Sequence, residues 1–347
     1  MRATIVLTVR NEGAFLLEWL SHHRAIGFTD FLVFSNDCDD GTDAMLDRLQ
    51  DMGWLTHMRN PAPHQGGVQW TALKLADKHP LVRNADWLLT LDIDEFVNIH
   101  IGDHTLSALL SALPEADAIT LTWRLFGNCG QFDFKDAPIT DQFIRAAPEL
   151  MYWPWRAFMF KTLYRANGAY KKLGVHRPRA PVDGLADKTR WFDGEGRELE
   201  DRFRRRQIFS PFGRKNYGLV QLNHYPLGTM EGYLLKCDRG RANHGDDQLG
   251  LDYWTERNWC IEKDTSIQNS AALRAPVLAG LQADPDLARL HQKAVAWRCN
   301  RIDQLLTEEP YRALLGRLIM SPPARPVPLN LARKLFQYAK TGNKNND

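Results

Sequence analysis

The chain has 347 residues, of which 44% are hydrophobic, 25% charged and 10% aromatic, as in ordinary globular proteins. This length allows one large domain with an appendage or two domains, and it excludes a peptide-sized binding module. The 44 Lys and Arg residues against 42 Asp and Glu residues leave a net charge of +2, which gives no argument for a nucleic-acid partner.

The first hundred residues alternate apolar runs with stretches of helical periodicity, which is the order expected of β-α-β units that build a parallel sheet. Gly27 is placed to end the first helix, and Thr42 to cap the second. The expected strands are residues 4–9, 31–34, 54–58 and 87–91, and the expected helices are residues 16–26, 42–53 and 69–78.

Beyond residue 100 the pattern loosens, because Gly, Pro and charged residues separate the apolar runs. Strands are expected at residues 118–123, 156–163 and 218–222, and helices from Thr229 onward. Segment 183–206 is rich in Gly and charge and ends in a cluster of arginines, which predicts a mobile lid that closes on a bound diphosphate.

The cysteines and the N-terminus indicate the cellular location. The five cysteines form no C-x-x-C pair, and no Asn-x-Ser/Thr site occurs. The first residues lack the features of a signal peptide, and no apolar stretch is long enough to span a bilayer. We therefore expect a cytoplasmic protein. Its tail, residues 329–347, is expected either to pack on its own domain or to touch the inner face of a membrane.

Polar or acidic residues follow three of the expected strands, at the point where each strand ends. Segment 10–13 follows the first strand, segment 35–42 the second and segment 92–95 the fourth. Ligands of an open parallel sheet bind outside the carboxyl ends of its strands, so the three segments predict one shared site.

Asp92 and Asp94 lie two residues apart on an extended segment, so both carboxylates can point to one side and share a divalent cation. Mg²⁺ or Mn²⁺ takes one or two protein carboxylates and completes its shell with phosphate oxygens and water. The pair therefore outlines a nucleotide-diphosphate site. Neither a G-x-x-x-x-G-K-[ST] nor a G-x-G-x-x-G motif occurs, which argues against a P-loop nucleotidase and a dinucleotide enzyme.

Several segments resemble GT-A glycosyltransferases, above all bacterial family 2-like enzymes and the related family 92. They are TVRNEGAFLLEWLSHHRAIGF, FLVFSNDCDDGTDAML, DWLLTLDIDEF and, later in the chain, LNHYPLGTMEGYLLKCDRG. The resemblance implies a GT-A-like, Rossmann-like α/β fold with a mostly parallel sheet flanked by helices and a helical C-terminal region. The implied domain spans residues 1–245, divided into a nucleotide-sugar half (1–100) and an acceptor half (101–245), with the helical region at residues 246–347.

The resemblance also implies roles for single residues. Asn11 and Glu12 fall at the edge of the nucleotide pocket, and Asp37 falls where an acidic residue reads the base. The implied donor-binding residues are Arg10, Asn11, Glu12, Asp37, Asp92, Lys236 and Arg239, with Arg241 as a further cation. The implied metal ligands are Asp92, Asp94 and His224, and the imidazole favours Mn²⁺ over Mg²⁺, which prefers oxygen. A structural role for His224, and a solvated helix face for Lys236 and Arg239, remain open.

The sequence leaves the catalytic base open among three residues. Family 2 enzymes place it in an x-E-D motif, which here falls on Asp201 in a charged loop where chance readily produces such a dipeptide. His176 resembles a Gly-x-His element of the related family, and a neutral imidazole accepts a hydroxyl proton near physiological pH. Asp133, beyond the FGNCG turn, is the third candidate.

These features predict a metal-dependent glycosyltransferase that moves a hexose-like sugar, with inversion, from a nucleotide diphosphate sugar to a hydroxyl of a saccharide or glycolipid. Surface polysaccharide or glycolipid assembly is the setting that the resemblance implies. A sugar nucleotidyltransferase is the alternative enzyme, although its glycine-rich basic N-terminal loop is missing. A domain that only binds carbohydrate is the alternative without catalysis, and the intact acidic pair disfavours it.

Overall fold

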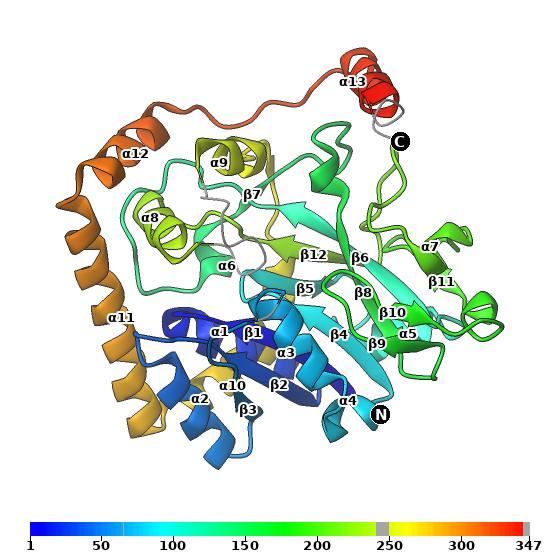
Figure 1. Cartoon of the computed structure of the whole chain (residues 1–347), viewed down its shortest axis with the longest axis horizontal. Helices are drawn as coiled ribbons and strands as arrows, with labels where there is room; N and C mark the ends of the chain where they lie inside the picture. Colours follow the sequence, from blue (N-terminus) through cyan, green and yellow to red (C-terminus); the bar gives the residue numbers. More distant parts are fainter. Residues whose placement is uncertain (65, 241–249, 343–347) are drawn as a thin grey trace.

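A central β-sheet with helices on both faces forms the body of the molecule (Figure 1). The computed structural model describes residues 1–64, 66–240 and 250–342. The nine-stranded sheet has the order β3-β2-β1-β4-β8-β6-β12-β5, and β11 pairs with β6 off this path. Its strands are β1 (Ala3–Val9), β2 (Asp30–Ser35), β3 (Thr56–Arg59), β4 (Trp87–Leu91), β5 (Glu95–Ile99), β6 (Ala118–Leu125), β8 (Phe160–Arg165), β11 (Trp191–Phe192) and β12 (Val220–His224).

The expected α/β class and mostly parallel sheet are confirmed. β1 pairs in parallel with β2 and β4, and β2 pairs in parallel with β3. In the second half, β8 runs antiparallel to β4 and β6, and β5 antiparallel to β12. Two further two-stranded sheets are formed by β7 (Arg145–Ala146) with β13 (Glu262–Lys263) and by β9 (Tyr170–Lys172) with β10 (Arg179–Pro181).

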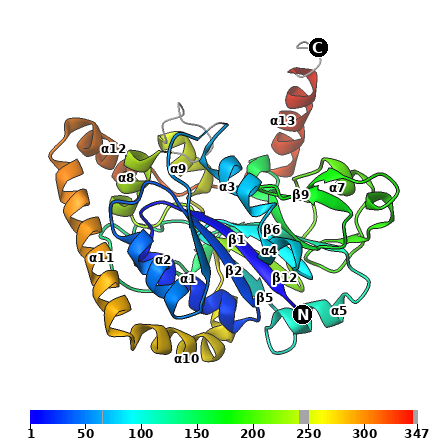
Figure 2. The same cartoon turned by 60° about the horizontal axis from the view of Figure 1, so that its bottom comes forward.

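Helices cover both faces of the sheet and continue into the C-terminal region (Figure 2). The α-helices are α1 (Gly13–Ala25), α2 (Thr42–Asp51), α3 (Val68–Ala76), α4 (Pro80–Arg83), α5 (Leu106–Ala112), α6 (Ile139–Gln142), α7 (Arg202–Arg205), α8 (Met230–Arg239), α9 (Leu251–Arg257), α10 (Ala271–Gln282), α11 (Pro285–Leu306), α12 (Glu309–Met320) and α13 (Leu329–Gly342). The 3₁₀ helices are η1 (Trp155–Phe158), η2 (Ala186–Lys188) and η3 (Ser266–Ser270).

The buried strands read as continuous apolar runs because both of their faces are covered. Successive side chains of a strand point to opposite faces, and in β1 Ile5 belongs to the core that includes residues of α1. Val6 belongs to the second core, together with Leu73 of α3. This sandwiching fixes β1 and β4 firmly, and with them the polar segments that follow their carboxyl ends.

The C-terminal helices are joined to the N-terminal half rather than apart from it. α10 and α11 pack against α1, and α11 also contacts α2 and α8, so the helical region borders the sheet on one side (Figures 1 and 2). The expected helical C-terminal region is thereby confirmed. The domain division stays a prediction, and its boundary at residue 245 lies outside the described residues.

Some boundaries differ from those expected. Thr42 does not cap α2, because Gly41 is the N-cap residue, with φ of 88°, and Asp40 accepts hydrogen bonds from the Thr42 amide and hydroxyl. The expected strand 156–163 begins as η1 and becomes a strand only at Phe160. β12 ends at His224 rather than residue 222.

The structure joins Cys129 to Cys260 by a disulfide, a pairing that the sequence spacing did not predict. Helix α13 stands clear of the body of the molecule in Figure 2. No helix in the described ranges is both long and apolar enough to cross a membrane.

Candidate functional site at the carboxyl ends of β1 and β4

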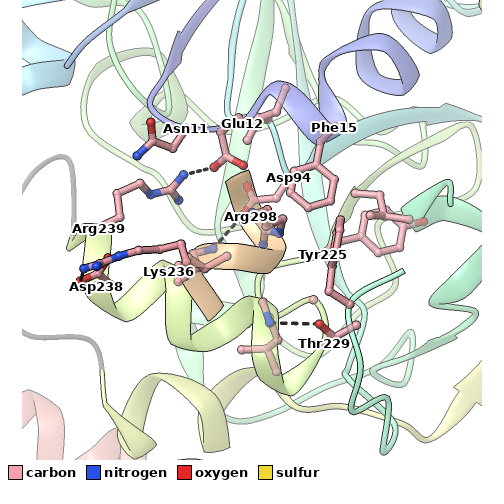
Figure 3. A pocket seen from close by; sticks show the side chains of 18 of the residues that line it. Asn11, Glu12, Phe15, Asp94, Tyr225, Thr229, Lys236, Asp238, Arg239 and Arg298 are labelled. Atoms are coloured by element: carbon pink, nitrogen blue, oxygen red, sulfur yellow. Dashed lines mark hydrogen bonds and ion pairs between the residues drawn. The ribbon is translucent and has the colours of Figure 1, made fainter. Parts of the chain in front are cut away.

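The expected meeting of strand ends occurs at β1 and β4, and a third element joins them. Paired in parallel, β1 and β4 deliver segment 10–13 and segment 92–95 to one edge of the sheet. β12 ends beside them, and α8 follows it directly. In Figure 3, Asn11, Glu12, Asp94, Lys236 and Arg239 lie around one cavity.

Of the two aspartates of the D-x-D motif, Asp94 is the one that lines this cavity. Its Oδ2 accepts a hydrogen bond of 2.8 Å from Lys236 Nζ, and its Oδ1 lies 3.7 Å from Nε2 of His224. Burial opposes ionisation of this carboxyl, but the charges of Lys236 and His224 outweigh it and hold the pKa of Asp94 well below its usual value. Asp94 is therefore an anion held between two basic groups.

Asp92 points to a different set of partners. Its Oδ2 accepts a hydrogen bond of 2.8 Å from Lys161 Nζ, and its Oδ1 one of 3.0 Å from Gln69. The two carboxylates of the D-x-D motif thus pair with different lysines, and the expectation that both face one cation is not met. The described part of the chain contains no group of three or more His, Cys, Asp or Glu side chains placed to hold a metal ion.

Glu95 ties this acidic segment to the core. Its carboxylate is fully buried, accepts hydrogen bonds from Trp123 Nε1 (2.6 Å) and from the Asp92 amide (3.0 Å), and lies 3.4 Å from Lys161 Nζ. Burial is the main cause that raises the pKa of Glu95 to about 8, against the charge of Lys161. The segment between β4 and β5 is therefore held in place by contacts with buried side chains of the core.

Of the three base candidates, only His176 lies close to this acidic segment. The ring of Trp123 contacts the His224 ring, at a centroid distance of 4.4 Å, and the His176 ring, at 5.5 Å. Nδ1 of His176 lies 3.1 Å from the Phe160 carbonyl, which can only accept, so the proton resides on Nδ1 and Nε2 carries the lone pair. Burial, with the charge of Lys161, lowers the pKa of His176 to about 4, and the ring is neutral at pH 7.

The other two base candidates lie elsewhere. Asp201 is 88% exposed and forms an ion pair with Arg204 at 2.9 Å. Its segment, 183–206, packs against β6 through β11. Asp133 is exposed, and none of the three base candidates, His176 included, is among the residues that line the cavity.

The arginines of segment 183–206 are also paired locally. Arg205 forms ion pairs with Asp183 and Asp187, and Arg190 with Glu198. No residue of this segment lines the cavity. The expected closure of this segment over a bound diphosphate or anionic acceptor is not seen in this arrangement and stays a prediction.

The cavity itself has a volume of about 460 Å³. Glu12 forms an ion pair with Arg239, whose Nη1 also donates to the Arg10 carbonyl at 2.8 Å, so α8 is tied to the end of β1. Of the expected donor-binding residues, Arg10, Asn11, Glu12, Lys236 and Arg239 line the cavity. Asp37 is exposed and Asp92 faces Lys161, and neither lines it; Arg241 lies outside the described residues.

Sequence reasoning missed several residues of this site. Lys161 carried a signal, since it is the only charged residue in the apolar run 157–163, and a lysine buried in such a run needs an acidic partner. Trp123 and Gln69 carried none, because their positions depend on how distant segments pack. Arg298 of α11 lines the cavity but lies far along the sequence from every recognised motif.

Comparison with known proteins identifies the family of the chain. The profile of glycosyltransferase family 92 matches residues 8–190, more than half of the chain. A family 92 protein of Oryza sativa subsp. japonica is 26% identical over 149 residues, and one of Ricinus communis is 26% identical over 102 residues. These matches cover 41% and 28% of this chain, but only 24% and 17% of the two plant proteins.

Among solved structures, Staphylococcus aureus TarS 1-349 in complex with UDP matches 48% of this chain and 47% of its own, with 15% identity and a TM-score of 0.31. The matched range includes the segments that follow β1 and β4, and it does not include α8. The chain belongs to glycosyltransferase family 92.

Proposed function

We propose that the cavity beside Asp94 binds a nucleotide diphosphate sugar and that the protein transfers this sugar to a hydroxyl of a saccharide or glycolipid acceptor. The observation that carries the proposal is the meeting of Asp94, Lys236 and Arg239 at one cavity. Two cations, Lys236 held by Asp94 and Arg239 held by Glu12, line this cavity and suit a ligand whose negative charge grows during the reaction. Family membership favours transfer over the nucleotidyltransferase and the purely binding alternatives.

The reaction forms a bond between the acceptor oxygen and the anomeric carbon and breaks the bond from that carbon to the diphosphate. Lys236 and Arg239 lie where their charges stabilise the departing diphosphate. His176, with the lone pair on Nε2, is the proposed acceptor of the hydroxyl proton. Attack from the side opposite the diphosphate inverts the configuration, so we propose an inverting hexosyltransferase.

We propose Mn²⁺, or Mg²⁺ less favourably, as the cofactor. Asp94 Oδ1 and His224 Nε2 face each other at 3.7 Å, too far for a hydrogen bond but close enough for both to coordinate one ion, so the pair fits a cation. A carboxylate and an imidazole together suit Mn²⁺, with diphosphate oxygens and water as the remaining ligands. When bound, such an ion neutralises charge on the diphosphate. Lys236 shares Asp94 with it through the other carboxylate oxygen.

A panel of nucleotide sugars, each tested by thermal denaturation with Mn²⁺ and with a chelator, tests this proposal. A donor that binds the native state raises the melting temperature, and we expect the rise to require the metal. Asp94→Asn should abolish the metal-dependent rise, while the exposed Asp51→Asn should keep it. If no nucleotide sugar stabilises or reacts with the wild type, the proposed function is wrong.

We further propose that the protein works in the cytoplasm, in the assembly of surface polysaccharide or glycolipid, and touches the inner face of the membrane through α13. Phe336 of this helix makes aromatic contacts with Trp153 and Phe212 of the body. Leu331 and Tyr338 are 45% and 62% exposed. Residues 321–342 contain no Asp or Glu and several basic residues, which favours an anionic lipid surface.

A further inference from the structure

The cations that line the cavity are not all balanced by acids. Lys236 pairs with Asp94, Arg239 with Glu12, and Arg301 with Asp238 at 2.8 Å. No ion pair among the described residues includes Arg298, although its side chain lines the same cavity. Within the described part of the chain, the cavity therefore holds a guanidinium that forms no direct ion pair with a carboxylate.

The surroundings of Arg298 are largely apolar. Its guanidinium carbon lies 4.7 Å from the centre of the Phe15 ring and 5.0 Å from that of Phe134. Its buried Nε has no hydrogen-bond partner. Burial is the main cause that lowers the pKa of Arg298 to about 10, although the charge of Glu12 opposes it. Such a placement is unfavourable for a cation unless a counter-charge arrives.

Neighbouring residues leave room for this guanidinium. A Cβ atom at Gly232 would lie only 3.1 Å from Nη2 of Arg298, so glycine permits the close approach of α8 to α11. Arg10, which also lines the cavity, has a buried Nε without a partner as well. Two guanidinium groups with unused donors thus face one cavity.

We propose that Arg298 binds an anionic group of the ligand, a phosphate or a carboxylate, at the end of the cavity formed by α11. The planar guanidinium donates two parallel hydrogen bonds to such a group, while the two phenyl rings exclude water around it. The anion is either the diphosphate of the donor or a charged group on the acceptor, and this part of the inference rests on the proposed function. The C-terminal helical region, outside the family match, would then complete the ligand site.

Binding of chemically defined probes to three variants tests the inference. The probes are UDP, GDP and pyrophosphate for the donor side, and glucose 1-phosphate and glucuronate for an anionic acceptor. Arg298→Met removes the charge at similar volume, and Arg298→Lys keeps the charge without the paired donors. Arg289→Met is the matched control, because Arg289 lies on the same helix, is 67% exposed and pairs only with Asp286.

We expect Arg298→Met to weaken at least one class of probe tenfold or more in calorimetry, and Arg298→Lys to recover part of the loss. A loss with UDP, GDP or pyrophosphate assigns Arg298 to the donor, and a loss confined to the sugar acids assigns it to the acceptor. The melting temperature without ligand should stay level or rise, because a buried cation is removed; Arg289→Met should bind as the wild type does.

Unchanged affinity for every probe that the wild type binds, or binding of none of them by the wild type, would overturn the inference. A lower melting temperature with unchanged affinity would also overturn it, since Arg298 would then be structural. If pyrophosphate binds through Arg298 but no nucleotide sugar is bound or turned over, the proposed function fails while this anion site stands.

Discussion

Lys161 lies beneath the acidic segment that follows β4 and holds it in place. Its side chain is fully buried, and its amine contacts Asp92 at 2.8 Å and Glu95 at 3.4 Å. Burial opposes its charge, but the two carboxylates outweigh this and raise the pKa of Lys161. This lysine is a positioning residue, because it sets the backbone from which Asp94 reaches the cavity.

Lys161→Met should destabilise the fold by about 1 to 3 kcal/mol, because the buried Glu95 loses a polar partner, while the raised pKa of Glu95 lets it take up a proton instead of remaining an unpaired charge. Urea unfolding measures the loss. The double variant Lys161→Met with Glu95→Gln should regain most of it, since the amide oxygen of Gln can still accept the hydrogen bond from Trp123. Equal stability of the single and double variants would contradict a charge-pairing role.

His224 carries the proposed preference for manganese. His224→Ala should lower transfer activity more with Mn²⁺ than with Mg²⁺, by roughly tenfold or more with the former, because the imidazole suits the softer ion. Steady-state rates with each metal at saturation give the comparison. Equal losses with both metals would indicate that His224 serves the packing against Trp123 instead.

At the scale of elements, one carboxylate joins the C-terminal region to the N-terminal half. Asp284 is the N-cap of α11 and accepts a hydrogen bond of 2.9 Å from the Leu287 amide. It also pairs with Arg48 of α2 through both of its oxygens, at 3.2 and 2.5 Å. The hydrogen bond from Arg48, followed by that from Leu287, lowers the pKa of Asp284 to about 2.

Asp284→Asn should keep the cap but lose the ion pair, so it should unfold at lower urea concentration than the wild type at pH 7. Since the pKa of the carboxyl is lower in the folded state, its contribution is present above the unfolded value and is lost as pH falls through the folded value. The gap between the two proteins should narrow as the pH falls below about 4. A gap that is constant from pH 7 to pH 3 would contradict the assignment.

Helix α13 can be tested separately from catalysis. Leu331→Ser with Tyr338→Ser should reduce sedimentation with vesicles of phosphatidylglycerol and phosphatidylcholine, because it removes apolar area from the exposed side. The control is Ile319→Ser with Met320→Ser, two residues that are equally exposed but lie at the end of α12. Binding that survives the α13 substitutions, or is equally strong to neutral vesicles, would remove this helix as the contact.

At the scale of the whole molecule, the sequence predicted those features that depend on local pattern. The strands around Leu7 and Leu89 were recognisable because buried parallel strands are uninterrupted apolar runs. The roles of Lys161 and Arg298 were not, because they depend on contacts between segments far apart in the chain. Composition also does not say which strand segment 183–206 packs against, so the pairing of β11 with β6 could not be predicted.

The disulfide is the other long-range feature that spacing did not predict. Because disulfides are rare in cytoplasmic proteins, this bond counts against the expected cytoplasmic location. It joins Cys129, after β6, to Cys260, before β13, across a sequence separation of 131 residues. The same two segments are held by hydrogen bonds from the Gly127 amide to the Trp259 carbonyl and from the Asn128 amide to Asn258 Oδ1, each 2.9 Å. Reduction therefore leaves them partly connected.

We expect thiol titration in denaturant without reductant to find three thiols, those of Cys38, Cys237 and Cys299. Cys129→Ser with Cys260→Ser should fold and should lose about 2 kcal/mol, the lower part of the usual range for a disulfide, because the hydrogen bonds between the segments remain. Urea unfolding of the variant and of the oxidised wild type measures the difference. Five thiols in protein purified without reductant would contradict the bond, and a loss above about 4 kcal/mol would mean that the hydrogen bonds alone do not hold the segments together.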